Sequence, residues 1–382
     1  MKTESEEVIK TEPNRRKQSN EQLEFVKESD EGSFVFENRK KDHIRLSLDP
    51  ATEASELQDL NRIQLNPMAL PELNLADIDS RTDFFGYQSP VPFFISSMTA
   101  GHRGANSINL ELARLAHETG IVLAVGSQRR QLTDSSADSE WLEIVEKFPR
   151  ARLMGNIGIS QLITHGPDQI LRVMESLGKP LGLFIHTNPL QEALQPEGTP
   201  QFAGGVDALR KICKLSPFPI VLKEVGCGLT YETLMMLAES GLSAVDLSGV
   251  GGTHWGRIEG LRSPERSVER QIAEVFYSWG QSSVQTLLEI ENIQFPFEIW
   301  ASGGVRNGLE ICKLLALGAQ KIGLARPFLQ AAILDAAADT GKIHLNQLVE
   351  KLQRELEIAM FCSGVREVKR FRIEKKWKLK RT

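Results

Sequence analysis

From Pro92 onward, short apolar runs alternate with longer stretches in which apolar residues recur at helical spacing. The apolar runs carry few polar positions, which is typical of parallel strands buried on both faces. They span residues 93–97, 121–126, 152–156, 181–185, 220–223, 244–247, 298–301 and 321–324. The helical stretches span residues 106–119, 138–147, 167–177, 206–214, 230–240, 282–291 and 308–317, and another begins at Pro327. Eight such strands alternating with helices predict a (β/α)8 TIM barrel, although a doubly wound sheet would produce a similar alternation.

The chain on either side of this pattern is irregular or charged. Residues 1–36 carry many charges of both signs and few large apolar side chains, so we expect a flexible N-terminal extension. Short strands within residues 63–75 would close one end of the domain. Residues 367–382 form a short basic tail, which we interpret as a solvated helix end. The expected barrel domain, with an N-terminal arm, therefore covers residues 37–366.

Polar side chains and glycines follow almost every predicted strand. The carboxyl ends of barrel strands meet on one face of the fold, and active sites lie there. The residues at these ends include Ser97, Met98, Thr99, Ala100, Ser127, Arg129, Asn156, His186, Asn188, Lys223, Ser248, Thr253, Arg306 and Arg326. Because chance would place polar groups at only one or two ends, we predict a binding site on this face.

Two glycine-rich stretches, SGVGGT (248–253) and SGGVRNG (302–308), follow the sixth and seventh strands. Glycine lets backbone N–H groups approach a phosphate closely, and a helix that begins near Asn307 would add free N–H donors. Lys223 ends an apolar strand and needs an anionic or electron-rich partner. The pyrimidine edge of a flavin is one such partner, and a salt bridge with Glu224 or another rim carboxylate is the alternative. Together these features predict a phosphorylated cofactor.

The fourth strand runs directly into a polar stretch. Pro189 stops the strand, and Gln191 and Glu192 follow in what we interpret as a loop. A carboxylate beside a neutral amide suits a Mg²⁺ ion that is shared with a phosphorylated ligand. A surface loop with an ordinary solvated glutamate is the alternative.

Composition excludes several classes of protein. The net charge of −5 over 382 residues gives no electrostatic case for nucleic acid as the main partner. The chain has no apolar run of about 18 residues and no apolar signal core, so we expect a cytoplasmic protein without a membrane span. The four cysteines are far apart and form no CxxC pair, which is typical of reduced thiols.

A set of short motifs occurs along the chain in a fixed order. The motifs are RKKDH (39–43), SSMTAG (96–101), AVGSQR (124–129), NIG (156–158), HTNPLQE (186–192), KEVGCG (223–228), SGVGGTHW (248–255), SWG (278–280), ASGGVRNG (301–308) and ALGA (316–319). This ordered set resembles the type 2 isopentenyl diphosphate isomerases over residues 37–366. Single pieces such as SGGVR also occur in other FMN barrels, but the ordered set is specific.

The resemblance implies an FMN-binding barrel that requires Mg²⁺ and interconverts isopentenyl and dimethylallyl diphosphate. In that family the flavin acts in its reduced form without net redox change, and NADPH serves to reduce it. The residues implied for substrate are Arg39, Lys40, Ser127, Arg129, His186, Asn188 and Gln191, with Gln191 at the reacting end. Those implied for FMN are Met98, Thr99, Ala100, Ser127, Asn156, Lys223, Ser248 and Thr253, with Gly303, Gly304, Val305, Arg306, Ala325 and Arg326 at its phosphate end. Glu192 would bind Mg²⁺, and the family is usually a homo-oligomer, a tetramer or octamer.

The residue types are consistent with this chemistry. An alkene moves by gaining a proton at one carbon and losing one from another, and ordinary side chains protonate an unactivated alkene poorly. A reduced flavin would supply the proton and stabilise the developing cation, while the protein orients and desolvates. Two positions depart from the family or vary within it: Arg326 stands where the family often has Gly, and His254 stands where the family varies.

Two other classes of function remain open. An α-hydroxyacid oxidase needs a His–Arg pair near the sixth strand, where this chain has GGTHW, and a nucleotide dehydrogenase needs a cysteine in a flexible loop, whereas Cys227 lies at a strand end. A flavin-binding sensor without turnover would not need Glu192 or a basic arm. The isomerase hypothesis accounts for more of these residues than its rivals do.

Overall fold

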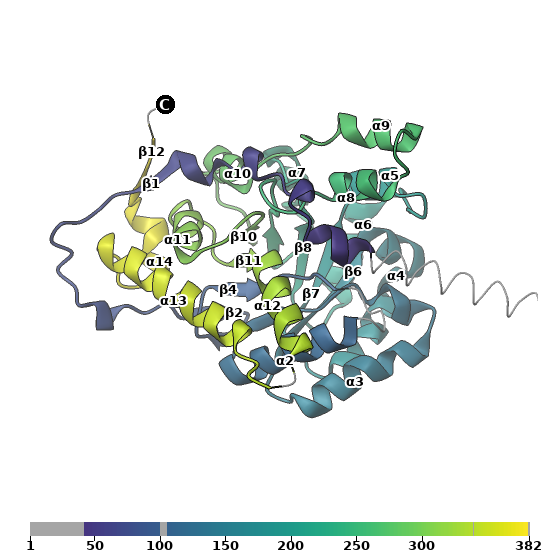
Figure 1. The fold of residues 1–382 in the computed structure, drawn as a ribbon, viewed down its shortest axis with the longest axis horizontal. Coiled ribbons are helices and arrows are strands. Elements are labelled where there is room, and N and C mark those ends of the chain that lie inside the picture. The colour runs from purple at the N-terminus through teal and green to yellow at the C-terminus, as the bar shows by residue number, and fades with distance from the viewer. Residues whose placement is uncertain (1–41, 100–104, 339, 381–382) are drawn as a thin grey trace, which may run out of the picture.

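The computed structural model describes residues 42–99, 105–338 and 340–380. Its centre is a closed barrel of parallel strands (Figure 1). The strands are β4 (Phe93–Ile95), β5 (Val122–Ala124), β6 (Arg152–Gly158), β7 (Gly182–Thr187), β8 (Ile220–Glu224), β9 (Ala244–Asp246), β10 (Glu298–Ser302) and β11 (Ile322–Leu324). The last strand, β11, pairs with the first, β4, and this pairing closes the barrel and excludes a doubly wound sheet. The predicted TIM barrel and each of its predicted strands are confirmed.

Helices surround the barrel (Figure 1). They are α2 (Asn106–Thr119), α3 (Asp138–Lys147), α4 (Ile159–Val173), α5 (Pro189–Leu194), α6 (Gly205–Leu215), α7 (Tyr231–Leu237), α8 (Trp255–Arg262), α9 (Val268–Val275), α10 (Ser283–Glu289), α11 (Gly308–Ala316), α12 (Arg326–Ala337), α13 (His344–Cys362) and α14 (Val368–Glu374). The predictions for α2 and α3 match residue for residue. Helix α4 begins earlier than predicted, because helical turns precede the kink at Gly166 and Pro167. Sequence reasoning missed α5, α8, α9 and α13.

Alternate residues of each barrel strand belong to different cores. Leu183 and Ile185 of β7 point outward into the large core shared with the helices, whereas Phe184 between them points into the barrel. Inside the barrel, Phe184 lies 5.8 Å from both Phe94 and Trp300, ring centroid to centroid. These rings, together with others from the β2–β3 hairpin, fill the amino end of the barrel.

The hairpin consists of β2 (Thr82–Phe84) and β3 (Tyr87–Ser89). Phe84 is fully buried and meets Trp300 edge to face at 5.5 Å. Lys321, which immediately precedes β11, lies 5.4 Å from the Phe84 ring centroid and pairs with Glu298. The hairpin therefore closes the end of the barrel opposite the predicted site.

The C-terminal tail packs against the domain. Strand β12 (Trp377–Leu379) pairs antiparallel with β1 (Ile63–Leu65) (Figure 1). Phe371 of α14 is fully buried. The helix end expected in the tail is present as α14, but the expectation that it is solvated is wrong, because Phe371 and Trp377 give an otherwise basic segment an apolar side. Within residues 63–75, the structure contains only the strand at 63–65.

We expect the Phe184→Ala variant to lower the free energy of unfolding by about 3–5 kcal/mol, the usual cost of removing a buried aromatic ring. Chemical denaturation followed by circular dichroism measures the change. Leu215→Ala on α6, where the side chain is largely exposed, is the matched control and should change stability little. Equal stability of the two variants would contradict a packed aromatic cluster.

Candidate functional site

A cavity of about 780 Å³ opens at the carboxyl ends of the barrel strands. The predicted residues that line it are Met98, Ser127, Arg129, Asn156, His186, Asn188, Gln191, Glu192, Lys223, Ser248, Thr253, Gly303, Gly304, Val305, Arg306, Ala325 and Arg326. Thr99 does not line it, because its hydroxyl donates to Asn109 of α2. Arg39, Lys40 and Ala100 lie outside the described residues. Apart from these exceptions, the fold gathers the predicted set around one space.

A buried ionic network lies at the floor of the cavity. Lys223 Nζ donates to the backbone carbonyl of Glu224 at 2.9 Å and to Ser248 Oγ at 3.2 Å, and it lies 3.6 Å from Asp246 Oδ2. Ser302 Oγ donates to the same carboxylate at 2.7 Å. The rim carboxylate that neutralises Lys223 is therefore Asp246, which sequence reasoning missed.

Several polar groups in this layer are available to a ligand. The hydroxyl oxygens of Ser96 and Ser97 are buried against the cavity and have no hydrogen-bond partner among the described residues. Asn156 and His186 face each other on adjacent strands, with Oδ1 and Nδ1 2.9 Å apart. Because buried hydroxyls without partners are costly, these residues fit a planar, hydrogen-bonding group such as a flavin ring.

The two glycine-rich loops pack directly on each other. A Cβ on Gly303 would overlap the carbonyl of Gly249, and one on Gly304 would overlap that of Gly251. Both Gly303 and Gly304 also have positive φ, at 105° and 73°. Their first role is thus backbone contact between the loops. Ser248, a non-glycine residue with a φ of 44°, is held in a strained conformation between them and Lys223.

The predicted free N–H donors near Asn307 are not free. Asn307 Oδ1 accepts from the N–H of Glu310, Glu310 accepts from that of Arg306, and Glu355 accepts from that of Gly308. Helix α12, by contrast, begins at the cavity wall, and Ala325 at its N-cap provides no side-chain hydrogen bond. Of these two helices, α12 is the one whose start is open to an anion.

Gln191 and Glu192 lie on helix α5, so the predicted loop is wrong. Pro189 occupies the first turn, where its missing N–H costs nothing, and it starts the helix as it ends the strand. Asn188 Nδ2 donates to Gln191 Oε1 at 2.9 Å and to Glu192 Oε1 at 3.1 Å. The backbone N–H of Thr199 donates to Glu192 Oε2 at 2.6 Å. Both side chains are thereby fixed at the cavity wall.

A second carboxylate, Glu259 of α8, faces Gln191. Gln191 Nε2 donates to Glu259 Oε1 at 3.2 Å, and His43 Nε2 lies 2.9 Å from the same oxygen. Burial alone would raise the pKa of Glu259, but His43 and Arg262 hold it below its ordinary value. Glu259 is therefore ionised, and it links the arm residue His43 to the residue predicted at the reacting end.

The residues that an oxidase or a dehydrogenase would need point away from the cavity. His254 is fully buried; its Nδ1 accepts from the N–H of Arg257, and its Nε2 lies 2.9 Å from the carbonyl of Trp279. Burial lowers the pKa of His254 and raises that of the Cys227 thiol. None of His254, Arg257 and Cys227 lines the cavity. The His–Arg pair of the oxidase hypothesis and the thiol of the dehydrogenase hypothesis are therefore not at the site.

Within the described ranges, no group of three or more His, Cys, Asp or Glu side chains could hold a metal ion. Glu192 offers a single carboxylate at the cavity. This donor set fits Mg²⁺, which commonly takes one or two carboxylates and completes its shell with water and phosphate oxygens.

Comparison with known proteins identifies the family. A family model described as FMN-dependent dehydrogenase matches residues 45–146 and 185–377, more than half of the chain. The chain is 47% identical to the isopentenyl-diphosphate delta-isomerase of Bdellovibrio bacteriovorus over 344 residues, covering 89% of this chain and 97% of that protein. The chain belongs to the type 2, FMN-dependent isopentenyl-diphosphate delta-isomerases. The isomerase of the same name from Legionella pneumophila (strain Philadelphia 1) is 44% identical and covers 87% of this chain and 95% of its own.

Solved structures of other proteins share the fold of this chain at lower sequence identity. A mandelate oxidase variant with an FMN monooxide adduct has a TM-score of 0.59 at 18% identity, covering 87% of this chain and 93% of its own. A flavocytochrome b2 variant with pyruvate bound has a TM-score of 0.62 at 21% identity, covering 87% and 80%. At such identities the likeness concerns the fold alone. No helix in the described ranges is both long and apolar enough to span a bilayer.

Glu224 is engaged away from the cavity. Its Oε2 accepts from the backbone N–H groups of Gly226, Cys227 and Gly228 at 2.6, 2.5 and 3.0 Å, which shapes the loop after β8. Complete burial raises the pKa of Glu224 from 4.5 to about 7, although these N–H groups and Lys223 oppose the shift. The folded state therefore binds one more proton than the unfolded state between these two pH values.

This difference predicts a pH-dependent contribution to stability. The contribution of Glu224 is full below pH 4.5 and is lost as the pH rises through about 7. We expect the wild type to lose stability relative to Glu224→Gln over that window, in denaturation curves recorded at each pH. Glu239→Gln, at an exposed position of the same βα segment, should show no such trend. A difference that does not vary with pH would mean that Glu224 stays ionised in the fold.

Proposed function

We propose that the protein isomerises isopentenyl diphosphate to dimethylallyl diphosphate, with reduced FMN and Mg²⁺ and without net redox change. The observation that carries this proposal is the arrangement over the cavity floor. Amides and hydroxyls make up much of the lining, and the carboxylate of Glu192 accepts hydrogen bonds from Asn188 and Thr199. Such a site would bind and orient, and it would leave proton transfer to carbon to a bound cofactor.

Different side chains of the cavity would bind the cofactor and the substrate. Lys223, neutralised by Asp246 and held by Ser248, would direct its remaining hydrogen-bonding capacity to the flavin ring. Ser96 and Ser97 would satisfy their hydroxyls on the same group. The start of α12 and the glycine-rich loops would hold the phosphate end. Reduced FMN, when bound, supplies the proton for the alkene and an electron-rich ring beside the cation.

The substrate would lie on the α5 side of the cavity. Gln191 would contact the reacting carbons, and its hydrogen bond to Glu259 defines which end of its amide is the N–H donor. Arg129 lines the cavity and forms no ion pair with another described residue, so it would be available to the diphosphate. Arg39 and Lys40, on the arm that precedes His43, would add two further cations.

Mg²⁺ would bridge Glu192 and the diphosphate. A carboxylate directed at a diphosphate repels it unless a cation lies between them, so the position of Glu192 is favourable only with a metal. Glu192 Oε1 accepts only the shared Asn188 amide at 3.1 Å, and this leaves lone pairs for a cation.

Three further expectations remain predictions, the first two from the resemblance and the third from the lack of an apolar signal core or span. NADPH would reduce the flavin, the protein would be a tetramer or octamer, and it would act in the cytoplasm. An apolar stripe on the exposed side of α9, formed by Val268, Ile272 and Val275, supports association between chains.

The direct test is anaerobic incubation of isopentenyl diphosphate with protein, FMN, Mg²⁺ and NADPH, followed by product analysis. We expect dimethylallyl diphosphate to form in large excess over the NADPH consumed, because each turnover returns the flavin to its starting state. Protein with oxidised FMN and no reductant is the control and should give no product. Product that matches NADPH consumption mole for mole would identify an oxidoreductase, and reduction without product would identify a sensor.

Glu192→Gln tests the metal site. The variant should need at least about tenfold more Mg²⁺ for half-maximal activity, since a charged metal ligand is lost, while its flavin spectrum stays unchanged. Gln191→Ala is the matched variant one position away and should lower turnover with little change in the Mg²⁺ requirement. Titrations of initial rate against Mg²⁺ measure both effects. A wild-type Mg²⁺ requirement in Glu192→Gln would place the metal elsewhere.

A further inference from the structure

A segment before the barrel, residues 46–58, lies across the glycine-rich loops, and we call it the strap. Backbone hydrogen bonds join Ala54 N–H to the Gly252 carbonyl at 2.8 Å and His254 N–H to the Thr52 carbonyl at 2.9 Å. The strap follows directly on the helical residues 42–47, which carry His43. Its position is therefore coupled to that of the arm at the substrate side of the cavity.

Two arginines, Arg306 and Arg326, form ion pairs with Glu53 of the strap. Arg306 Nη2 lies 3.2 Å from Glu53 Oε1, and Arg326 Nη1 lies 3.4 Å from Glu53 Oε2. Arg306 is fully engaged, since it also donates to the carbonyls of Gly251 and Gly304 and to Gln58 Oε1. One carboxylate thus faces two guanidiniums, and this leaves excess positive charge at this point.

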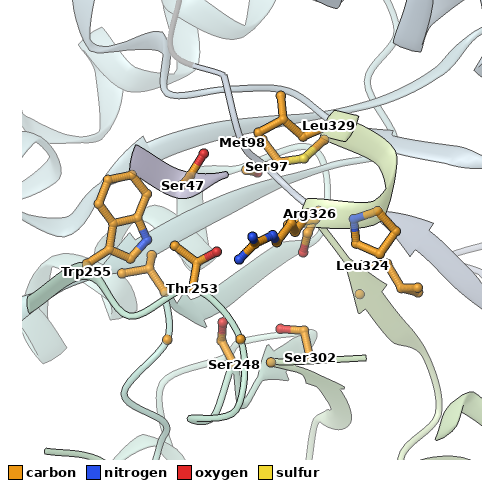
Figure 2. A pocket seen from close by; sticks show the side chains of 18 of the residues that line it. Ser47, Ser97, Met98, Ser248, Thr253, Trp255, Ser302, Leu324, Arg326 and Leu329 are labelled. Atoms are coloured by element: carbon orange, nitrogen blue, oxygen red, sulfur yellow. The ribbon is translucent and has the colours of Figure 1, made fainter. Parts of the chain in front are cut away.

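Arg326 is the arginine with open hydrogen-bonding capacity. Its Nη2 donates to the Leu48 carbonyl of the strap at 2.7 Å, whereas its buried Nη1 has no hydrogen bond among the described residues. Figure 2 shows the guanidinium extending into the cavity toward Thr253. Arg326 is also the first residue of α12, whose N-terminus is uncapped. An anion at that helix start would meet both the helix N–H groups and the guanidinium, whose Nη1 makes no hydrogen bond and lies 3.4 Å from Glu53 Oε2.

We propose that Arg326 is a positioning residue that couples the phosphate end of the flavin to the substrate arm. This inference rests on the proposed binding of FMN. A phosphate would take the place of Glu53 at Nη1, while Glu53 keeps its ion pair with Arg306 and Nη2 keeps the Leu48 carbonyl. One planar guanidinium would then connect cofactor and strap. Phosphate binding would then stabilise the strap and the helical segment that carries His43. The flavin phosphate would thereby prepare the arm for the diphosphate substrate.

Riboflavin separates this coupling from binding of the flavin ring, because it has the ring system of FMN without the phosphate. We expect Arg326→Gly to raise the Kd for FMN about tenfold, the effect of losing one charge-assisted hydrogen bond. The same variant should leave the Kd for riboflavin within about twofold of wild type. Quenching of flavin fluorescence measures both constants. Leu309→Ala, at an exposed position of the neighbouring helix α11 that does not line the cavity, is the control and should change neither constant.

Hydrogen exchange of strap peptides tests whether phosphate binding stabilises the strap. In the wild type, saturating FMN should slow amide exchange in residues 44–54, and saturating riboflavin should not. In Arg326→Gly saturated with FMN, the slowing should be lost. Arg326→Lys keeps the charge but lacks the planar fork, so it should retain most of the FMN affinity and also lose the slowing. If circular dichroism shows that Arg326→Gly does not fold, Arg326→Lys tests the coupling in its place.

The outcomes separate the two proposals. Wild-type protein that binds neither flavin would refute FMN binding itself. Wild-type protein that binds FMN, with Arg326→Gly or Arg326→Lys showing the same slowing of exchange, would refute the coupling and leave the isomerase proposal standing. An equal loss of FMN and riboflavin affinity in Arg326→Gly would also refute it, because the arginine would then act on the ring or on the fold.

Discussion

The two-residue period of the barrel strands is the constraint on which the rest of the structure depends. In a closed barrel, every second side chain points inward, and inward positions two residues apart lie in successive layers. Phe184 belongs to the apolar layer at the amino end, so His186 belongs to the layer above it. In the same way, Trp300 belongs to the apolar layer and Ser302, two residues later, to the polar layer. The aromatic residues make the lower layer rigid and dry, and the polar layer above it therefore has a fixed floor.

The loops above that floor are held by backbone contact and by charge. Gly303 and Gly304 allow two loops to touch main chain to main chain, and a side chain at either position would separate them. The buried charges around them are mostly paired, as Lys223 is with Asp246. A buried charge is tolerated when it is paired, and an incompletely paired cation such as Arg326 marks a place for an anion. The cavity is thus organised for anionic ligands before any ligand binds, and this organisation supports the proposed diphosphate substrate and the flavin phosphate.

Much of the fold and of the site could be predicted from the sequence, because the relevant signals are local. Buried parallel strands appear as short apolar runs, and the polar residues that end or follow each run mark the barrel rim. This rule alone placed Asn156, Lys223 and Arg326 on the cavity, and all of them line it. The same pattern also indicates that Asp246 points into the barrel, because it lies two positions beyond the inward-facing Ala244. Arg39 and Lys40 lie outside the described residues and stay predictions.

What the sequence by itself determined is the barrel, the polar rim and the family, because period, turn residues and motif order are properties of neighbouring residues. The tertiary structure alone decided which distant groups meet. Gln191 and Glu259 are 68 positions apart, and no local pattern predicts their hydrogen bond. The pairing of the tail with β1 is equally non-local, as is the contact of Arg326 with the Leu48 carbonyl. Such contacts depend on how packed elements bring loops together, and a one-dimensional pattern does not contain that geometry.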